Sequence, residues 1–464
     1  MLFPTVEFGV FFPLVLALSW ALMPRPHAWK PFIVLASYAF YAAASWRFCF
    51  LLAGITLVNQ LGAVLAHRSG VDSRRAKRIV ALTVAVDLGV LGLFKYYGFF
   101  ATDVDRVLDS LRLGLPLPLL TLALPVGVSF FTFQAISYVV DVRRGLIAPA
   151  SLLDTSVYLS FFPHLVAGPI VRAREFMPQL ATPRDPSDVK LGAGVALVAI
   201  GLVKKVVLAD FLARTVVDPV FGVPGAYGTA DVLLAAYAYA AQIYCDFSGY
   251  TDIAIGLALL LGFVFPQNFD RPYSARSFRE FWRRWHMTLS RFLRDFLYIP
   301  LGGNRGGRLF TARNLMITMV LGGLWHGAAW TFVLWGAFHG VCLTTEHLGR
   351  GRVRLPGWLG WLVTFHLVVL GWVLFRSQDL GLAGDFLSRL VAGGSATLWT
   401  VPAVGAVLLV IGLQLVPPRP LDRVRLRVER LHPALLGAGL AALIGFVAAT
   451  VPAQGVPPFI YFRF

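Results

Sequence analysis

The sequence predicts an all-α integral membrane protein with about 10 to 12 membrane-spanning helices, plus re-entrant and interfacial helices. Its 464 residues are 57% hydrophobic, with a mean hydropathy of +0.71. Only 14% of the residues are charged, whereas soluble globular domains carry about 25%. Apolar runs near the roughly 20 residues that a spanning helix needs recur from residue 8 to residue 452. We therefore expect a single membrane domain over residues 1–464.

The positive charge is distributed as in membrane proteins. The formal net charge is +17, but the 41 Lys and Arg residues form short clusters between apolar runs, so we expect no nucleic-acid partner. If these clusters face the cytoplasm, the apolar runs alternate in direction and the N-terminus lies outside. The early runs are 8–22, 31–46, 48–66, 79–98 and 119–140, and the late ones are 357–376, 399–416 and 433–452. The first run lacks a basic start and a cleavage signal, which favours a retained span.

Residues 314–344 are predicted to enter the membrane and return on the same side. Both flanks carry basic residues typical of the cytoplasm. Two full spans need about 40 residues, but this segment has only 31, five of them glycine. A broken or re-entrant helix pair is the economical interpretation, with its turn near Trp325 to Ala329. That turn places His326 deep in the membrane.

An ionisable side chain at membrane depth is costly and indicates a function. His326 lies in the glycine-rich segment GGLWHGAAW, where small residues leave room for a ligand to reach the imidazole. We therefore predict a functional role for His326. The other histidines of apolar runs, His164, His339 and His366, are better explained singly as hydrogen-bond partners between helices.

Residues 277–297 are predicted to form one amphipathic helix at the cytoplasmic interface. One arc of this helix is aromatic and aliphatic, and the opposite arc carries Arg279, Arg283, Arg284, His286, Ser290, Arg291 and Arg294. Glu280 with Arg284, and Arg291 with Asp295, are spaced as ion pairs. Guanidinium groups bind phosphate bidentately. The arginines are therefore candidate phosphate ligands, and an ordinary interfacial anchor is the alternative.

A third feature is the apolar stretch 236–263, which contains Asp246 and Asp252. The residues Ser248 to Thr251 between them favour a break between two helices, where polar side chains line a cavity. Pairing of the two aspartates with Arg or Lys is the alternative. The three cysteines lie far apart in or beside apolar runs, so neither a disulfide framework nor a metal cluster is expected.

Residues 236–346 resemble the membrane-bound O-acyltransferases, and within that family the members that act in bacterial alginate O-acetylation. The likeness lies in YCDFSGYTDIAIGLALLLGF, PQNFDRPYSARSFREFWRRWHMTLSRFLRDFLYIPLGGNR and LGGLWHGAAWTFVLWGAFHG. It implies a ring of helices with a cytoplasmic funnel, and it matches His326 and His286 to the two characteristic histidines of the family. It also implies acetyl-CoA as acyl-donor substrate with no tightly bound cofactor or metal. Its further implications are a bacterial inner membrane location, an exported polysaccharide and a periplasmic SGNH-type acetyltransferase partner.

These inferences combine into a hypothesis for the reaction. A cytoplasmic thioester places its phosphates on Arg279, Arg283, Arg291 and Arg294. His326 takes the proton of an acceptor hydroxyl, a step typically worth about 10²–10⁴-fold. His286 positions the donor, and a supporting polar network comprises Ser290, Asp295, Asp246 and Trp325. The alternatives are a D-alanyl transferase of the teichoic acid type, a transporter and a structural export subunit, and the sequence does not name the polysaccharide.

Overall fold

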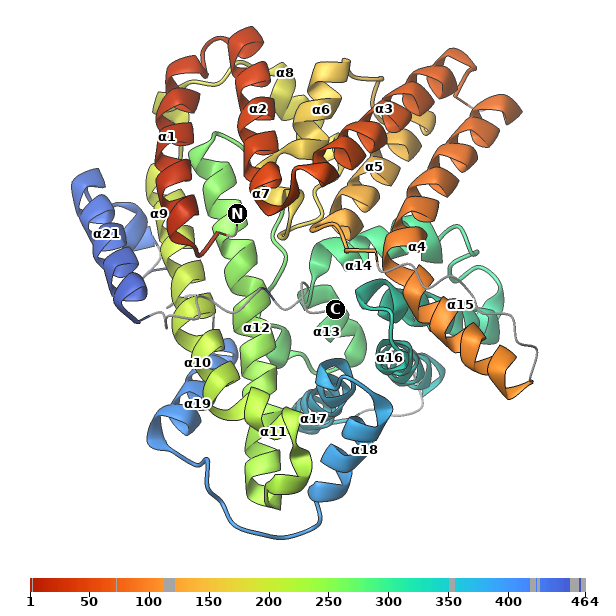
Figure 1. Ribbon diagram of the computed structural model, residues 1–464, viewed down its shortest axis with the longest axis vertical. Helices are drawn as coiled ribbons and strands as arrows, with labels where there is room; N and C mark the ends of the chain where they lie inside the picture. Colours follow the sequence, from red (N-terminus) through yellow and green to blue (C-terminus); the bar gives the residue numbers. More distant parts are fainter. Residues whose placement is uncertain are drawn as a thin grey trace. The chain divides into compact units, whose positions relative to one another are not determined.

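The computed structural model describes residues 3–71, 73–111, 122–349, 355–417 and 426–450, together with Met1, Arg423 and Phe459. Every regular element in these residues is a helix, as Figure 1 shows, so the predicted all-α class is confirmed. Two compact units divide the chain, and α12 continues from the second into the first. The first comprises Met1–Gly194 and Ala254–Pro266, and the second comprises Val195–Ile253 and Gln267–Phe464. The ring, the funnel and the single domain stay predictions.

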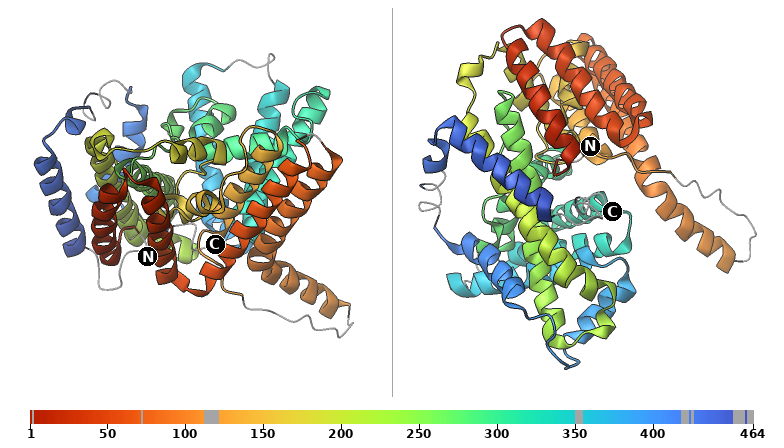
Figure 2. Two further views of the ribbon diagram at one scale, coloured as in Figure 1. Left: turned by 90° about the horizontal axis from the view of Figure 1, so that it is seen from above. Right: turned by 60° about the vertical axis from the view of Figure 1, so that its left-hand side comes forward.

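The first unit contains the early apolar runs as helices. They are α1 (Val6–Leu22), α2 (Pro26–Ser45), α3 (Arg47–Arg68), α4 (Arg74–Ser110) and α5 (Val128–Arg143), followed by the short α6 (Leu152–Ser160), α7 (Phe162–Leu165) and α8 (Ala173–Ala181). The Thr5 hydroxyl caps α1, and a proline begins α2, where its missing N–H costs nothing. Helices α3 and α4 run side by side in Figures 1 and 2. The first residues of the predicted run 119–140 lie outside the described part of the chain.

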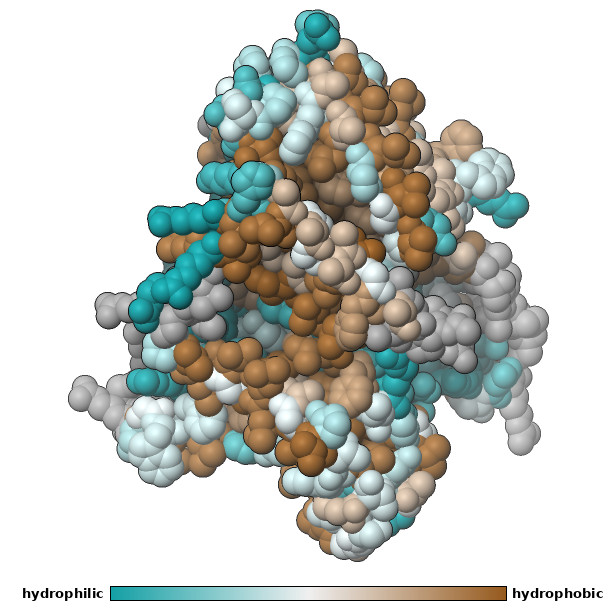
Figure 3. All heavy atoms as spheres, turned by 90° about the vertical axis from the view of Figure 1, so that its left-hand side faces the viewer, coloured by the Kyte–Doolittle hydropathy of each residue, from teal (hydrophilic) through white to brown (hydrophobic). Residues whose placement is uncertain are grey.

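The surface of these helices suits lipid better than water. Helix α1 exposes Val6, Val10, Leu14 and Leu18, which follow one another at helical spacing. Hydrophobic residues, in brown, cover much of the face in Figure 3. A contiguous apolar face of this kind on a soluble monomer would be an interaction site. Among the described residues, α3, α4, α12 and α17 are long and apolar enough to cross a membrane, and α1, α19 and α21 are shorter apolar helices.

The second unit contains most of the sequence motifs. Its helices are α9 (Leu191–Leu202, which begins in the first unit), the π-helical η2 (Val203–Ala209), α10 (Asp210–Leu212), the π-helical η3 (Ala213–Val217), α11 (Asp218–Gly222) and α12 (Thr229–Leu260). They continue with α13 (Phe278–Arg284), α14 (Met287–Leu293), the π-helical η6 (Arg294–Tyr298), α15 (Gly307–His326) and α16 (Trp330–Gly349). The last are α17 (Gly357–Arg376), α18 (Leu380–Arg389), α19 (Val401–Leu415) and α21 (Pro433–Thr450). One-turn 3₁₀ segments lie at Pro224–Ala226 and Pro272–Ser274 in this unit, and at Pro186–Asp188 in the first.

The predicted break at Ser248 to Thr251 is wrong, because α12 is continuous there. Gly249 serves close packing instead. A Cβ atom on Gly249 would lie 3.1 Å from Cβ of Lys204, and one on Gly201 would lie 2.9 Å from the backbone nitrogen of Ile253. The helix therefore needs glycine so that the neighbouring backbone can approach.

The alternative explanation of the two aspartates is correct. Lys204 Nζ lies 2.6 Å from Asp252 Oδ2, and Lys205 Nζ lies 2.7 Å from Asp246 Oδ1. Asp210 also pairs with Lys205, at 2.6 Å. Both lysines come from the π-helical η2, and a buried carboxylate is tolerated only when it is paired in this way.

The predicted turn of the in-and-out segment is confirmed. Helix α15 ends at His326 and α16 begins at Trp330, which leaves three residues for the turn. The predicted shortage of residues is wrong, because the helices continue past residues 314 and 344 into the charged flanks. Each helix has 20 residues, which corresponds to about 30 Å. Whether the pair crosses the membrane or turns back inside it stays a prediction.

Candidate functional site

His326 ends α15 inside a cluster of aromatic rings. Its side chain is 3% exposed. The ring centroids of Trp335 and Phe375 lie 5.1 and 5.2 Å from that of His326, both nearly perpendicular to it. Trp335 belongs to α16 and Phe375 to α17, so three consecutive helices surround the imidazole. Aromatic walls of this kind exclude water from a reacting group.

Backbone geometry explains why α15 stops at His326. The next residue, Gly327, is extended, with φ of −161° and ψ of 154°. A Cβ atom at Gly327 would lie 3.0 Å from Cζ of Phe332. It would lie even closer to Cε2 and Cδ2 of the same ring. Only glycine fits here without displacing the Phe332 ring, so the local sequence His-Gly places the imidazole at the helix end.

His286 lies in a kink between two short helices, which corrects the prediction of one helix over residues 277–297. Helix α13 begins with the Ser277 hydroxyl accepting a hydrogen bond from Glu280 N, and it ends at Arg284. His286 then adopts a left-handed backbone, with φ of 41° and ψ of 55°, before α14 begins. A helical wheel across this kink is invalid. His286 therefore leaves the polar arc on which the sequence analysis placed it, and its side chain is fully buried.

Asn268 holds the buried imidazole of His286. Nδ1 of His286 lies 3.1 Å from Oδ1 of Asn268, and the same oxygen accepts hydrogen bonds from the backbone and hydroxyl of Thr288 at 3.1 and 2.9 Å. Because an amide oxygen only accepts, Nδ1 carries the proton. Nε2 has no hydrogen-bond partner among the described residues. Burial lowers the pKa of His286 to about 3, so its imidazole is neutral at neutral pH.

Trp325 is the ring neighbour that His286 and His326 share. Its ring centroid lies 5.0 Å from that of His326 and 6.3 Å from that of His286. The ring centroid of Phe247, from α12, also lies 4.7 Å from that of His286. The structure thus places both predicted histidines beside one indole, within the second unit.

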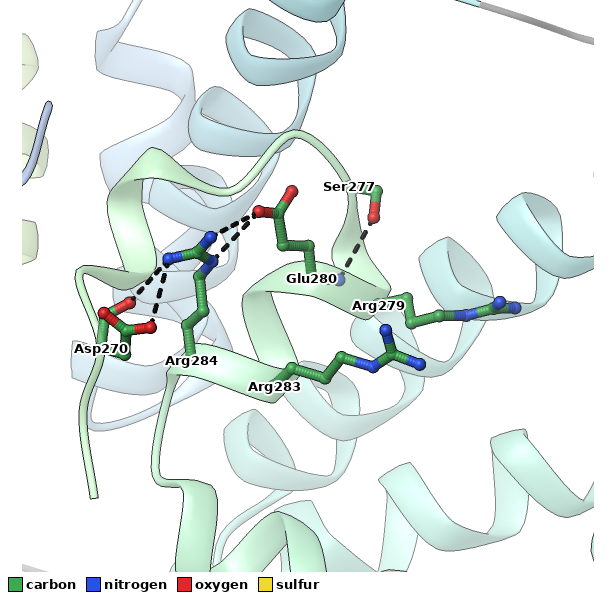
Figure 4. A pocket seen from close by; sticks show the side chains of 6 residues that line it. All are labelled: Asp270, Ser277, Arg279, Glu280, Arg283 and Arg284. Atoms are coloured by element: carbon green, nitrogen blue, oxygen red, sulfur yellow. Dashed lines mark hydrogen bonds and ion pairs between the residues drawn. The ribbon is translucent and has the colours of Figure 1, made fainter. Parts of the chain in front are cut away.

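Helix α13 borders an open pocket of about 480 Å³. Its lining residues are Asp270, Ser277, Arg279, Glu280, Arg283 and Arg284. Figure 4 shows Arg284 between the carboxylates of Glu280 and Asp270, with N···O distances of 2.8 and 3.5 Å. The Glu280–Arg284 pair is as predicted. Arg279 and Arg283 extend side by side away from this group, and among the described residues their guanidinium groups form no ion pair. Two cationic side chains therefore remain available at the pocket for an anion.

Comparison with known proteins identifies the fold family. The profile of the membrane-bound O-acyltransferase family matches residues 119–373, which is more than half of the chain. The chain belongs to this family. It is 45% identical over 368 residues to the probable alginate O-acetylase of Pseudomonas aeruginosa, covering 78% of this chain and 70% of that protein.

Two further relatives carry different activities. The chain is 36% identical to the peptidoglycan O-acetyltransferase of Helicobacter pylori, over 80% of this chain and 75% of the relative. It is 27% identical to the teichoic acid D-alanyltransferase of Bacillus subtilis, over 54% of this chain and 69% of the relative. The chain is therefore a membrane protein and an O-acyltransferase. These findings favour an enzyme over the transporter and the structural subunit.

The remaining predicted residues of this O-acyltransferase are dispersed. Arg294 is exposed and binds Asp295, with Nε 2.6 Å from Oδ1. Arg291, on α14, and Arg294, on η6, do not line the pocket on α13. The Ser290 hydroxyl bonds to the carbonyl of Trp285 at 3.4 Å. Asp246 belongs to the buried ion-pair cluster of Lys205. The predicted set therefore separates into Arg279 and Arg283 at the pocket, the two histidines at Trp325, and residues that lie elsewhere.

The other histidines of the acyltransferase have separate environments. His164 Nε2 lies 2.7 Å from the carbonyl oxygen of Tyr158, as a structural role predicts. His366 Nδ1 lies 2.7 Å from the Leu362 carbonyl of its own helix, so it does not connect two helices as predicted. His339 is fully buried among aromatic rings, and neither ring nitrogen has a hydrogen-bond partner in the part of the chain that the structure describes. The prediction of a hydrogen-bonded His339 is wrong.

Sequence reasoning missed four residues that shape the family's histidine site. Asn268 and Thr288 hold His286, and Trp335 and Phe375 enclose His326. Asn268 lies in the PQNFD segment of the recognised motif, directly before a basic and aromatic stretch. A polar side chain at that position could have indicated a contact with the site. Phe375 gave no signal, because one aromatic residue in an apolar helix is ordinary. Within the described residues, no group of three or more His, Cys, Asp or Glu side chains is arranged to hold a metal ion.

Proposed function

We propose that this enzyme O-acetylates an exported polysaccharide, with acetyl-CoA from the cytoplasm as donor. The names of the relatives carry this proposal. The alginate O-acetylase and the peptidoglycan O-acetyltransferase both transfer acetyl groups onto glycans, and they match this chain at 45% and 36% identity over 78% and 80% of its length. The D-alanyltransferase matches at 27% over 54%. Acetyl transfer is therefore favoured over D-alanyl transfer.

The location and partner follow from the same proposal. The enzyme resides in the inner membrane of a bacterium, with the N-terminus and the acceptor side in the periplasm. The acetyl group crosses the membrane at this protein and reaches the polymer through a periplasmic SGNH-type acetyltransferase. The positive-inside distribution of the basic loops supports this orientation.

His326 acts as the general base in the proposed reaction. The acceptor hydroxyl oxygen attacks the thioester carbonyl carbon while His326 takes the hydroxyl proton. The carbon–sulfur bond then breaks, and the proton passes from His326 to the departing thiolate. General-base help of this kind is worth about 10²–10⁴-fold in rate. Burial among Trp335 and Phe375 supports the role, because it keeps water from hydrolysing the thioester.

His286 contributes a hydrogen-bond acceptor in the proposed mechanism. Its Nδ1–H donates a hydrogen bond to Oδ1 of Asn268. The Nε2 lone pair is therefore left to accept a hydrogen bond from a substrate N–H or O–H group. Its position beside Trp325, the neighbour of His326, supports this role.

The phosphates of the donor bind at the pocket on α13. Arg279 and Arg283 are the proposed ligands, because they line the pocket and, among the described residues, form no ion pair with a carboxylate. Arg284 is neutralised by Glu280 and Asp270. Guanidinium groups bind phosphate through two parallel hydrogen bonds, and such charge-assisted bonds are among the stronger ones in proteins.

The test of this function is the acetyl ester content of cell-surface polysaccharide. Cells that produce His326→Ala should export polymer without acetyl ester, while the protein stays in the membrane at the normal level. The matched control is His366→Ala, which alters an exposed histidine on α17 and should leave acetylation normal. Normal acetylation in the His326→Ala strain would overturn the assignment.

D-alanyl transfer is distinguished by mass analysis of the same polymer. An acetyl ester that disappears with the gene supports the proposal. A D-alanyl ester that disappears with the gene would assign the enzyme to the activity that the Bacillus subtilis relative is named for.

A further inference from the structure

Asn268 organises the kink that contains His286. Its side chain is 1% exposed and lies in the connection between α12 and α13. Oδ1 accepts hydrogen bonds from His286 Nδ1, Thr288 N and Thr288 Oγ1, and the Asn268 carbonyl accepts one from Met287 N at 2.9 Å. One asparagine therefore contacts all three residues at the start of α14.

The orientation of the Asn268 amide is fixed by its other contacts. A backbone N–H only donates, so the atom that Thr288 N contacts must be the oxygen. The amide nitrogen instead donates to Thr251 Oγ1 on α12 at 3.4 Å. His286 thus faces an atom that accepts only, and its neutral ring is restricted to the tautomer with the proton on Nδ1.

In this tautomer Nε2 of His286 carries no proton and presents its lone pair. That atom is buried, without a hydrogen-bond partner among the described residues, and beside the ring of Trp325. A left-handed backbone at a residue other than glycine is unfavourable and persists only where its surroundings enforce it. The kink, the buried ring and the unused lone pair together indicate a side chain held for a purpose other than packing.

We propose that Asn268 is a positioning residue for acyl transfer. It fixes the tautomer and the direction of His286, so that Nε2 accepts a hydrogen bond from an O–H or N–H group of the substrate. This inference rests on the proposed function, because it assigns His286 a part in acyl transfer. It adds a residue that does not touch the substrate and acts through His286.

The charges near His286 determine how Asn268→Asp would change the pKa of the imidazole. The ring contacts Asn268, Phe247 and Trp325, all uncharged. The charged groups next along these elements have partners, since Asp246 pairs with Lys205, and Asp270 with Arg284. On the flanks of the kink, Arg283 faces the α13 pocket and Arg291 lies on α14. The other titratable ring nearby is His326 on α15. Among the described residues, a carboxylate at position 268 would therefore be the one unpaired charge in contact with the imidazole.

The experiment compares Asn268→Asp and Asn268→Ala with wild type in proteoliposomes. The rate of CoA release from acetyl-CoA, with the periplasmic partner acetyltransferase and alginate oligosaccharide present, is measured against pH. In Asn268→Asp the carboxylate still accepts the hydrogen bond from Nδ1–H, but its negative charge raises the pKa of His286. As the pH is lowered, activity should therefore be lost at a higher pH than in wild type. Activity should recover at alkaline pH, where the imidazole is neutral. Alanine should lower kcat about 10- to 100-fold at every pH, as loss of an orienting partner typically does. KM for acetyl-CoA should change little in either variant.

Two control variants separate positioning from folding. Thr288→Val removes one donor to Asn268, and Thr251→Val removes the partner of its amide nitrogen. Neither touches the bond to His286, so each should lower kcat less than Asn268→Ala does. Size-exclusion chromatography in detergent checks that each variant is folded, and Asn268→Asp serves if Asn268→Ala is not.

The outcomes distinguish this inference from the proposed function. A shifted acidic limb in Asn268→Asp, with kcat lost in Asn268→Ala, supports the inference. If His286→Ala and His326→Ala are inactive but both Asn268 variants match wild type at all pH values, the inference is wrong and the proposed function stands. If wild type releases no CoA, or if His286→Ala and His326→Ala are as active as wild type, the proposed function fails, and the inference with it.

Discussion

Gly323 and Gly336 meet where α15 packs against α16, and a Cβ atom on Gly323 would lie 3.0 Å from Cα of Gly336. Gly336 is packed as tightly against α15, because a Cβ atom on Gly336 would lie 3.0 Å from Cα of Val320. Small residues at such crossings let membrane helices approach backbone to backbone. Gly323 precedes His326 by one helical turn, so this contact fixes where the imidazole lies relative to Trp335.

Alanine at either glycine is expected to destabilise the helix pair. The added methyl group cannot fit without moving a backbone, and overpacking of this kind costs about 1–3 kcal/mol. The higher helix propensity of alanine offsets only about 1 kcal/mol of this cost. Gly323→Ala and Gly336→Ala should therefore lower the thermal unfolding temperature in detergent and reduce acetylation. Gly405→Ala on α19 is the control, because nothing lies within 4 Å of its added Cβ. Unchanged stability of both variants would contradict the packing argument.

Lys205 is expected to be essential for stability, because it compensates two buried carboxylates. Its Nζ lies 2.6 Å from Asp210 and 2.7 Å from Asp246, and all three side chains are at most 4% exposed. Removal of one partner from a buried ion pair costs about 3–5 kcal/mol. Lys205→Met should therefore sharply lower the amount of folded protein in membranes.

Two further variants test the electrostatic reason. Lys204→Met breaks a pair with Asp252 whose side chains are 23% and 20% exposed, so its effect should be smaller. Lys205→Met combined with Asp210→Asn and Asp246→Asn removes the uncompensated charge and should recover part of the lost protein. A triple variant no better than Lys205→Met would show that packing, and not charge, is responsible.

Arg279 and Arg283 are expected to set the affinity for the acyl donor. Charge-assisted hydrogen bonds contribute about 1.5–3 kcal/mol each, so Arg279→Gln or Arg283→Gln should raise KM for acetyl-CoA about 10-fold or more, with kcat less affected. Arg294→Gln is the informative comparison, since Arg294 is exposed, binds Asp295 and does not line the pocket. Its KM should rise less. Equal increases in KM for Arg279→Gln and Arg294→Gln would contradict the assignment of the donor phosphates to the pocket on α13.

The sequence was sufficient for features that depend on local composition. Apolar runs of helical length located α1 and α3 to within two residues at each end, because hydropathy is averaged over many positions. The run that predicted α2 began at residue 31, whereas the helix begins at Pro26 with a polar and basic first turn. The turn after His326 was also predictable, since basic flanks on both sides required the chain to return. Both inferences needed only neighbouring residues.

Features that depend on distant partners were not predictable. The kink at His286 arises because Asn268, 18 positions earlier, binds its side chain. No periodicity reports such a contact, so the helical wheel continued through it. Gly249 was equally ambiguous, because a glycine that breaks a helix and one that admits a neighbouring backbone look the same in sequence. The close packing at Gly249 becomes evident only when the pairing of Lys204 with Asp252 and of Lys205 with Asp246 is known.

Cysteine labelling tests the predicted orientation of the first helices in the membrane. If the cluster from Arg68 to Arg78 faces the cytoplasm, the end of α2 lies outside and the end of α3 lies inside. In a background with Cys49→Ser, Cys245→Ser and Cys342→Ser, Ala44→Cys should react with a membrane-impermeant maleimide in spheroplasts. His67→Cys should react only after permeabilisation, and the cysteine-free protein should not react at all. Both target residues are exposed in the structure, so access is not limited by burial. The reverse labelling pattern would place the N-terminus in the cytoplasm and would also reverse the side from which Arg279 and Arg283 receive the donor.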